Sequence, residues 1–343
     1  MPVRYPAPLR PGDLVGVTSP SSGVPADLRP RLAFCVEDLH RCGYDVVVGR
    51  CMDGEGVVSA PAAERAAELM DMLLDPRVRA VVPPWGGELL VEVLPHLDLE
   101  ALRRAEPTWV VGFSDVSTLL LPLTTAAGWA TLYGSNLLET PYEVPPPLAH
   151  WLDVAGVSQG GSVVQGASTA HRAHGFDPWQ DDPTYTRYSL DRGGRWSLLD
   201  PAGGPVRVQG RLVGGCVETV SILAGTAYGD LPAFAREHAP EGLLVHVEAS
   251  GDVATDIARD LWRMRLAGWF DDARAVLVAR TTAPDADGFT QLDAVRSVLG
   301  DLGLPVVLDV DCGHLVPRLT LVNGALAELE VDGDVQRLTQ TLV

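Results

Sequence analysis

The alternation of short apolar runs with longer helix-forming runs most limits what this chain can fold into. In the first third of the sequence, each apolar run of four or five residues is followed by a helix-like segment. Strands that alternate with helices in this way form a parallel sheet covered on both faces. The expected strands are Leu14–Val17, Asp45–Val48, Val78–Val82 and Trp109–Phe113, and the expected helices are Ala26–Arg41, Pro61–Leu74, Glu88–Leu97 and one that begins at Asp115.

This pattern predicts an α/β protein of two domains with a segment of different character between them. Residues 1–141 are expected to form an N-terminal parallel-sheet α/β domain. Residues 206–343 are expected to form a smaller C-terminal α/β domain, because the alternation returns there, for example in the strands Leu243–Val247 and Pro305–Val310. Residues 142–205 begin near a proline run and are rich in glycine and aromatic residues. We interpret them as a linker with a long aromatic loop, and loops of that length are usually functional or disordered.

The charge of the chain argues against nucleic acid or a membrane surface as its partner. The sequence contains no lysine, and its 26 arginines face 45 acidic residues, so the formal net charge is −19. Such a surface repels phosphate backbones and anionic lipids, although a few arginines in a cleft can still attract a small anion. The N-terminus lacks the apolar core of a signal peptide, and the apolar stretch 118–132 is too short to span a bilayer. We therefore expect a cytoplasmic protein with no membrane partner.

Three reactive side chains follow three expected strands. Ser114 comes directly after Trp109–Phe113, Glu248 after Leu243–Val247, and His314 shortly after Pro305–Val310. Ligands of open α/β sheets bind beyond the carboxyl ends of the strands. A nucleophile, an acid and a base at that edge are the components of a Ser–His–acid triad. Each residue alone has a commoner structural role, as a helix cap, a solvated charge or a turn residue, so only their joint placement supports the hypothesis.

Two glycine-containing turns are suited to this chemistry. Gly112 stands two residues before Ser114 and permits a tight strand-to-helix turn, although Val116 replaces the second glycine of the usual nucleophile elbow. The turn that contains Gly86 and Gly87 also follows a strand. Its amides, together with that of Asp115, predict an oxyanion hole. Neither turn matches the phosphate-binding patterns of nucleotide-binding proteins.

These segments together resemble the LD-carboxypeptidase family of serine peptidases, which includes the microcin C self-immunity proteins. The resemblance begins at Arg10-Pro11-Gly12-Asp13 and covers nearly the whole chain; its other segments are Gly86-Gly87, Val111-Gly-Phe-Ser-Asp115, Gly210-Arg-Leu-Val-Gly-Gly215, Glu248 and Asp311-Cys-Gly-His314. It implies Ser114 as nucleophile, Glu248 as acid, His314 as base, and an oxyanion hole from Gly87 and Asp115. It also implies a homodimer without a metal or organic cofactor.

Within this family the chain is most similar to the self-immunity branch, whose members hydrolyse an aminoacyl nucleotide. The long aromatic insertion before Gly210 carries this similarity, which implies that a tryptophan there stacks on a nucleobase. Trp179 is the first candidate for that contact and Trp196 the second, and Trp85 beside the paired glycines is a further one. The branch has a lysine where this chain has Gly251, and Arg280 is the candidate replacement. The family's asparagine after the paired glycines is replaced by Cys216.

Three other functions stay open at this point. The same triad also suits an LD-carboxypeptidase that acts on murein tetrapeptides. A cysteine enzyme that uses Cys312 or Cys216 with His314 is a weaker alternative, because Cys312 and His314 stand too close in one turn to reach the same carbonyl. A protein that binds a peptide or nucleoside conjugate without cleaving it is the third, since the fold alone does not exclude it.

Overall fold

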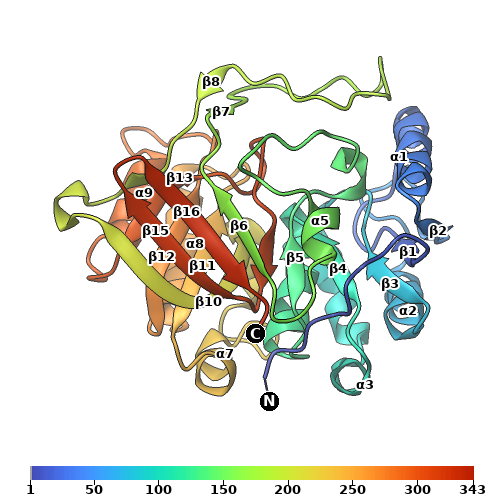
Figure 1. Cartoon of the computed structure of the whole chain (residues 1–343), viewed down its shortest axis with the longest axis horizontal. Helices are drawn as coiled ribbons and strands as arrows, with labels where there is room; N and C mark the ends of the chain where they lie inside the picture. Colours follow the sequence, from blue (N-terminus) through green and yellow to red (C-terminus); the bar gives the residue numbers. More distant parts are fainter. Residues whose placement is uncertain (1) are drawn as a thin grey trace.

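The computed structural model describes residues 2–343 and contains two large sheets that lie side by side (Figure 1). The first sheet has the strand order β14-β5-β4-β3-β1-β2. Strands β1 to β5 run parallel to one another, and only β14 is antiparallel. Their bounds are Leu14–Val17 (β1), Asp45–Val48 (β2), Val78–Val81 (β3), Trp109–Gly112 (β4), Thr131–Tyr133 (β5) and Leu321–Asn323 (β14). The predicted N-terminal parallel sheet is therefore present.

The second sheet has eight strands in the order β6-β16-β15-β10-β11-β12-β13-β9. Its four central neighbours, β10 to β13, are parallel, and the flanking strands pair antiparallel. The fold is therefore α/β in both domains, as predicted. The bounds are Ser162–Gly166 (β6), Ser197–Leu198 (β9), Val206–Cys216 (β10), Leu243–Glu248 (β11), Ala273–Ala279 (β12), Val306–Val310 (β13), Leu326–Asp332 (β15) and Val335–Thr341 (β16).

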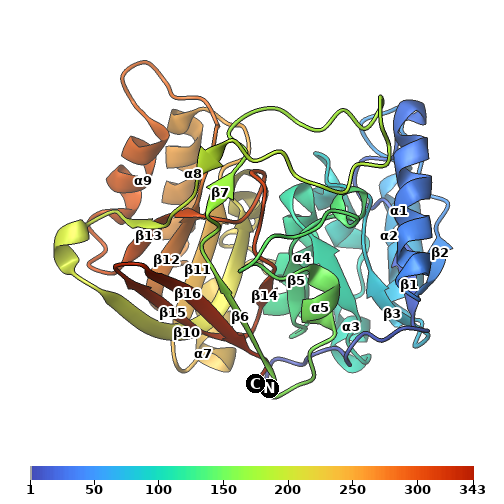
Figure 2. The ribbon, with the colours of Figure 1, turned by 45° about the horizontal axis from the view of Figure 1, so that its top comes forward.

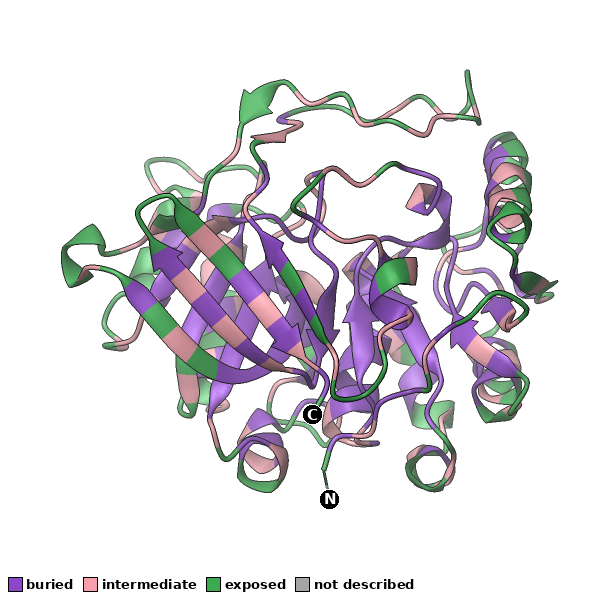
Figure 3. Cartoon of the chain, in the orientation of Figure 1, coloured by how far each residue is buried: buried purple, intermediate pink, exposed green. Residues whose placement is uncertain are grey.

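Helices cover the sheets and also fill the space between them. The strands of the first sheet are mostly buried except for the edge strand β2, whereas β15 and β16 alternate between buried and more exposed residues (Figure 3). This alternation is expected where only one face of a sheet meets the core. The longer helices are α1 (Arg29–Arg41), α2 (Ala62–Leu74), α4 (Ser117–Thr125), α7 (Leu231–His238), α8 (Ala254–Leu266) and α9 (Gln291–Leu299); the shorter ones are α3 (Leu99–Arg104), α5 (Trp151–Ala155) and α6 (Val217–Val220).

Helix α4 explains the most apolar stretch of the sequence. Residues 117–124 are all buried, because α4 packs against β10 of the second sheet as well as against its own sheet. The hydroxyl of Ser117 accepts a hydrogen bond from the backbone N–H of Cys216 at 3.1 Å, which joins the helix to the end of β10. Within residues 2–343, no helix is long and apolar enough to cross a membrane.

The middle segment contains more regular structure than the sequence predicts. Strand β6 forms an edge of the second sheet, β9 forms the other edge, and β7 (Ala170–His171) pairs with β8 (Arg192–Gly193). These strands are two to five residues long, so no period can be recognised in the sequence. The stretch between β7 and β8 is the long loop, and it reaches across to α1 (Figure 2). There, the guanidinium of Arg31 donates to the carbonyls of Pro183 and Tyr185 at 2.8 and 2.7 Å.

Two of the helices predicted from the sequence differ from the structure in helix type or in their first turn. The segment from Leu90 to His96 is a 3₁₀ helix instead of an α-helix, and Pro95 lies inside it. Proline removes a backbone donor and disfavours a regular α-helix. A single 3₁₀ turn, Ser114–Val116, precedes α4, so the serine lies at the tight junction between β4 and the helix.

Candidate active site

Ser114 lies in a backbone conformation that few residues other than glycine adopt. Its φ is +62°, in the left-handed region, which costs about 1–3 kcal/mol unless the surroundings enforce it. The side chain of Val116 packs against the preceding strand, where a Cβ on Gly112 would lie 2.7 Å from it. Glycine is thus required at 112, and the turn does not need a second glycine at 116. Such a strained strand-to-helix turn is typical of an exposed nucleophile.

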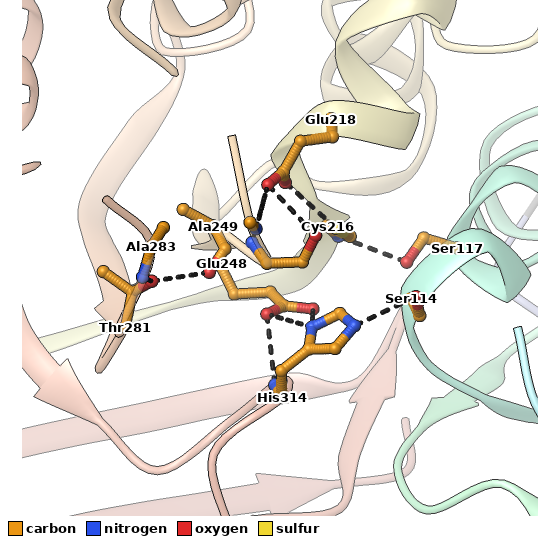
Figure 4. A network of polar contacts seen from close by, with 12 residues as sticks. Ser114, Ser117, Cys216, Glu218, Glu248, Ala249, Thr281, Ala283 and His314 are labelled. Carbon is orange, nitrogen blue, oxygen red and sulfur yellow. Dashed lines mark hydrogen bonds and ion pairs between the residues drawn. The ribbon is translucent and has the colours of Figure 1, made fainter. Parts of the chain in front are cut away.

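A continuous line of hydrogen bonds joins the three residues that the sequence placed at strand ends (Figure 4). Nε2 of His314 lies 3.0 Å from the Ser114 hydroxyl. On the other side of the ring, Nδ1 lies 2.9 Å from Oε2 and 3.1 Å from Oε1 of Glu248. A carboxylate can only accept, so Nδ1 carries the proton and Nε2 is free to accept one from serine.

Glu248 is held in place from two sides. It is the last residue of β11 and only 1% exposed, and the hydroxyl of Tyr133 at the end of β5 donates to its Oε1 at 2.5 Å. The backbone N–H of His314 donates to Oε2 at 3.2 Å. The Glu248 carboxylate can lie this close to the backbone because residue 313 is glycine. Gly313 has a φ of +79°, and a Cβ there would lie 2.1 Å from Oε2. Any larger residue at 313 would displace the carboxylate.

The electrostatics of the pair favour the charged form of both partners. Burial would raise the pKa of Glu248, but the charge of His314 and hydrogen bonds from His314 and Tyr133 lower it below its ordinary value. Burial would lower the pKa of His314, but the Glu248 carboxylate outweighs it and raises that pKa above 6.5. The imidazole is therefore a stronger base than a free histidine.

The two predicted glycines border Ser114. A Cβ on Gly86 would lie 2.9 Å from the Ser114 Cβ and 3.1 Å from the backbone nitrogen of Asp115. Gly87 has a φ of +147°, and a Cβ there would meet the hydroxyls of Ser21 and Ser22 at 2.3 Å. Within residues 2–343, the amides of Gly87 and Asp115 donate no hydrogen bond, which leaves both available to a ligand.

The carboxylate of Asp115 has a structural role. Its Oδ2 accepts hydrogen bonds from the Ser21 hydroxyl at 2.5 Å and from the Leu90 amide at 2.8 Å, and its Oδ1 accepts from Thr118 at 3.1 Å. It therefore joins the segments that contain Ser21 and Leu90 to the Ser114 turn. No local sequence pattern indicates this role.

A pocket of about 540 Å³ opens beside Ser114 and His314. Its wall includes the predicted substrate contacts Trp85 and Trp179, and both Gly86 and Gly87. The Trp179 Nε1 donates to the hydroxyl of Tyr142 at 2.8 Å, and the Tyr142 ring stacks on Tyr188 at 4.4 Å. The aromatic residues of the wall are Trp85, Phe113, Tyr142, Phe176, Trp179 and Tyr188. Several flat rings therefore lie in the wall of this pocket, which suits a ligand with a planar group.

Two predicted substrate contacts, Trp196 and Arg280, do not line this pocket. Trp196 is only 1% exposed, and its Nε1 donates to Oδ2 of Asp311 at 2.8 Å. Arg280 forms an ion pair with Oδ1 of the same carboxylate at 2.6 Å. The structure thus places both side chains against the buried carboxylate of Asp311, three residues before His314, and not at the pocket beside Ser114. Trp196 directly precedes the edge strand β9 and points into the core.

Several residues of the site carried no sequence signal. Arg318 donates through Nε to the carbonyl of Gly313 at 2.7 Å and forms a buried ion pair with Glu139. Its guanidinium lies 4.1 Å from the centre of the Phe113 ring, whose edge meets the His314 imidazole at 5.0 Å. This cluster supports the turn that carries His314. Tyr133 and Arg172 were also missed, since nothing in their sequence neighbourhood indicates a partner far along the chain.

The two cysteines near the site are not suited to act as nucleophiles. Burial raises the pKa of both Cys216 and Cys312 well above the ordinary value for a thiol. The Cys216 thiol donates to Oε2 of Glu218 at 3.1 Å. Ligand atoms of Cys216, Glu248 and His314 lie within 4.8 Å of one another, a possible arrangement for a metal ion. Nδ1 of His314 already faces the Glu248 carboxylate, so a metal there would break that hydrogen bond.

Family models match both halves of the chain. The LD-carboxypeptidase N-terminal domain matches residues 15–134, and the LD-carboxypeptidase C-terminal domain matches residues 209–329. A putative carboxypeptidase from Streptomyces coelicolor is 30% identical over 333 residues, which cover 95% of this chain and 93% of the relative. The murein tetrapeptide carboxypeptidase of Pseudomonas aeruginosa is 26% identical over 73% of this chain and 70% of its own length.

A third relative has solved structures. The microcin C7 self-immunity protein MccF of Escherichia coli is 26% identical over 98% of this chain and 95% of its own length. A structure of MccF in complex with aspartyl sulfamoyl adenosine matches this fold with a TM-score of 0.81 and 23% identity, and covers 98% of each chain.

Proposed function

The chain belongs to the LD-carboxypeptidase family of serine peptidases, and we propose that it hydrolyses an amide bond in a small peptide-like substrate with Ser114, His314 and Glu248. The observation that carries this proposal is the line of hydrogen bonds from Ser114 through His314 to Glu248 beside the pocket. A binding protein would need no such combination of nucleophile, base and buried carboxylate.

The contacts suit a two-step acyl transfer. Nε2 of His314 takes the proton of the Ser114 hydroxyl while the oxygen attacks the substrate carbonyl. The oxygen of the tetrahedral intermediate becomes negative and accepts hydrogen bonds from the free amides of Gly87 and Asp115. His314 then gives its proton to the leaving nitrogen, and the C–N bond breaks. Water then attacks the acyl ester in the same way, with His314 again as the base, and free Ser114 is regenerated.

The role of Glu248 is to stabilise the imidazolium that forms in both steps. Its carboxylate is buried and stays ionised, because the charge of His314 and the Tyr133 hydroxyl lower its pKa against the effect of burial. The same contacts hold the imidazole in the tautomer that presents a lone pair to Ser114. Glu248 and His314 thus lie at or shortly after the ends of two strands of the second sheet, and Ser114 lies shortly after the end of a strand of the first sheet.

For the substrate class we propose an aminoacyl or peptidyl nucleotide of the microcin C type. The relative MccF has been solved with aspartyl sulfamoyl adenosine, and the pocket offers Trp179 and Trp85 to a planar base. The second candidate is a murein tetrapeptide, supported by the similarity to the Pseudomonas aeruginosa enzyme. Both substrates would use the same three residues.

Mass spectrometry of the products tests the proposal and separates the two substrates. The protein is incubated with an aspartyl-adenylate analogue and, separately, with an L,D-tetrapeptide. Release of aspartate supports the nucleotide substrate, and release of a terminal D-residue supports the murein substrate. Ser114→Ala should abolish either release, whereas Ser297→Ala, a change on the exposed face of α9, should not. Activity that survives Ser114→Ala would rule out the proposed nucleophile.

The homodimer and the cytoplasmic location expected from the sequence are part of the same proposal. Analytical ultracentrifugation of the purified protein tests the first, since a dimer has twice the 36.6 kDa mass of the chain. Fractionation of the producing cells tests the second.

A further inference from the structure

The pocket beside Ser114 is lined by acidic and aromatic side chains and by one arginine. The chain has no lysine, so arginine is its only permanently cationic side chain. Among the described residues that line the pocket, Arg172 is the only arginine, whereas Glu88, Glu139 and Asp177 are acidic. A leaving fragment with a phosphate or a carboxylate would therefore meet a single positive charge in this pocket.

The backbone of Arg172 is fixed by a hydrogen bond, whereas part of its guanidinium is available to a ligand. Its backbone N–H donates to the carbonyl of Val316, two residues after His314, at 2.9 Å. Nη1 forms an ion pair with Oδ1 of Asp177 at 2.9 Å, and the side chain is 12% exposed. Within residues 2–343, Asp177 is the only side chain that pairs with the guanidinium, and neither Nε nor Nη2 is among the buried unpaired atoms. Both nitrogens can therefore donate to a ligand.

The position of Arg172 is coupled to the aromatic wall. Oδ2 of Asp177 accepts a hydrogen bond from the Tyr142 hydroxyl at 2.5 Å, and that hydroxyl in turn accepts from Trp179 at 2.8 Å. Arg172, Asp177, Tyr142 and Trp179 all line the pocket. The charge thus lies at the end of a chain of contacts that begins at the ring proposed to meet the planar group.

The other arginines near the site do not line this pocket. Arg280 is paired with Asp311 outside this pocket. Arg318 is 2% exposed and holds both oxygens of Glu139. Arg31 donates to the carbonyls of Leu138, Pro183 and Tyr185 and does not line the pocket.

We propose that Arg172 binds the anionic group of the leaving fragment of the substrate. This inference rests on the proposed function, since it assigns the recognition of that substrate. Two free nitrogens of a planar fork match two oxygens of a phosphate or a carboxylate. The partly buried position weakens screening by salt, so this local charge acts on the ligand despite the net charge of −19. The anion is the phosphate of a nucleotide or the carboxylate of a terminal D-residue.

Calorimetric titration of the inactive Ser114→Ala protein tests this with two matched ligand pairs. The first pair is AMP and adenosine; the second is an L,D-tetrapeptide and its C-terminal amide. Within one pair, the anionic ligand should bind about tenfold more tightly than the neutral one. Adding Arg172→Gln should remove that preference and change the affinity for the neutral ligand less than twofold. Arg172→Lys should keep part of the preference.

The matched control is Arg187→Gln, on the same loop but 81% exposed and outside the pocket. It should leave every affinity unchanged. Equal weakening of the anionic and neutral ligands by Arg172→Gln would overturn the inference, because it would indicate a purely structural role. So would the absence of any preference for an anion. A third outcome separates the two proposals. If Arg172→Gln removes the preference for the anionic ligand but the protein with Ser114 intact hydrolyses neither substrate, the anion site is supported and the proposed function is contradicted.

Discussion

Glu248 receives two hydrogen bonds from His314, one from the imidazole Nδ1 at 2.9 Å and one from the backbone N–H at 3.2 Å. The carboxylate thus positions both the ring and the turn that carries it. The longer side chain of glutamate, compared with aspartate, lets a residue at the end of β11 reach over Gly313 to both donors.

The activity should depend on pH through His314. The base is active only when its imidazole is neutral, and Glu248 raises the pKa of that group above 6.5. A raised pKa keeps the ring protonated to higher pH, so activity should rise with pH and reach half its maximum above 6.5. The check is the pH dependence of kcat/KM, which reports the free enzyme. In Glu248→Gln the midpoint should move to lower pH and kcat should fall by about 10³–10⁴-fold, because the tautomer is lost. An unchanged midpoint in Glu248→Gln would contradict this assignment.

Removal of the Tyr133 hydroxyl should weaken catalysis without affecting substrate binding. Tyr133 is fully buried, donates to Glu248 and does not line the pocket. We expect Tyr133→Phe to lower kcat by about tenfold, the equivalent of one hydrogen bond to a charged group, and to leave KM unchanged. Steady-state kinetics give both values. A rise in KM with an unchanged kcat would show that Tyr133 acts on the substrate site instead.

Gly313→Ala should inactivate the protein, because the new Cβ would occupy the place of the Glu248 carboxylate, 2.1 Å away. The matched control is Gly333→Ala, which also has a positive φ but has nothing within 4 Å of the added carbon. Both variants should lose about 1 kcal/mol of stability to backbone strain, and only Gly313→Ala should lose activity. Thermal unfolding and product release are measured for both. Equal activity in the two variants would contradict the proposed role of Glu248.

The two tryptophans of the middle segment should behave differently. Trp179 lines the pocket, whereas Trp196 is buried against Asp311. Trp179→Ala should raise KM and leave the unfolding temperature nearly unchanged. Trp196→Ala should lower stability by about 3–5 kcal/mol, as large aromatic truncations in a core do. Denaturant unfolding measures the stability of each variant, and steady-state kinetics measure KM. A raised KM in Trp196→Ala together with lost stability in Trp179→Ala would contradict the positions of the two side chains.

The sequence alone determined those features of the site that depend on residues close together along the chain. Ser114, Glu248 and His314 each stand directly or shortly after a short apolar run, and Gly112 and Gly86 mark tight turns, so both the strand ends and the residue types were visible. The α/β class followed from the same alternation. Such features depend on neighbouring residues along the chain, which a single sequence displays.

Only the tertiary structure decided which distant residues meet. Tyr133 contacts Glu248 across 115 positions and Arg318 pairs with Glu139 across 179, with no local pattern to indicate either. The short strands β6 and β9 became visible only through pairing with β16 and β13. Trp196 is buried in the core, whereas Trp179 and Arg172 line the pocket, and no local pattern separates these three residues. These choices depend on the packing of the two sheets, because burial and charge pairing are properties of the assembled core.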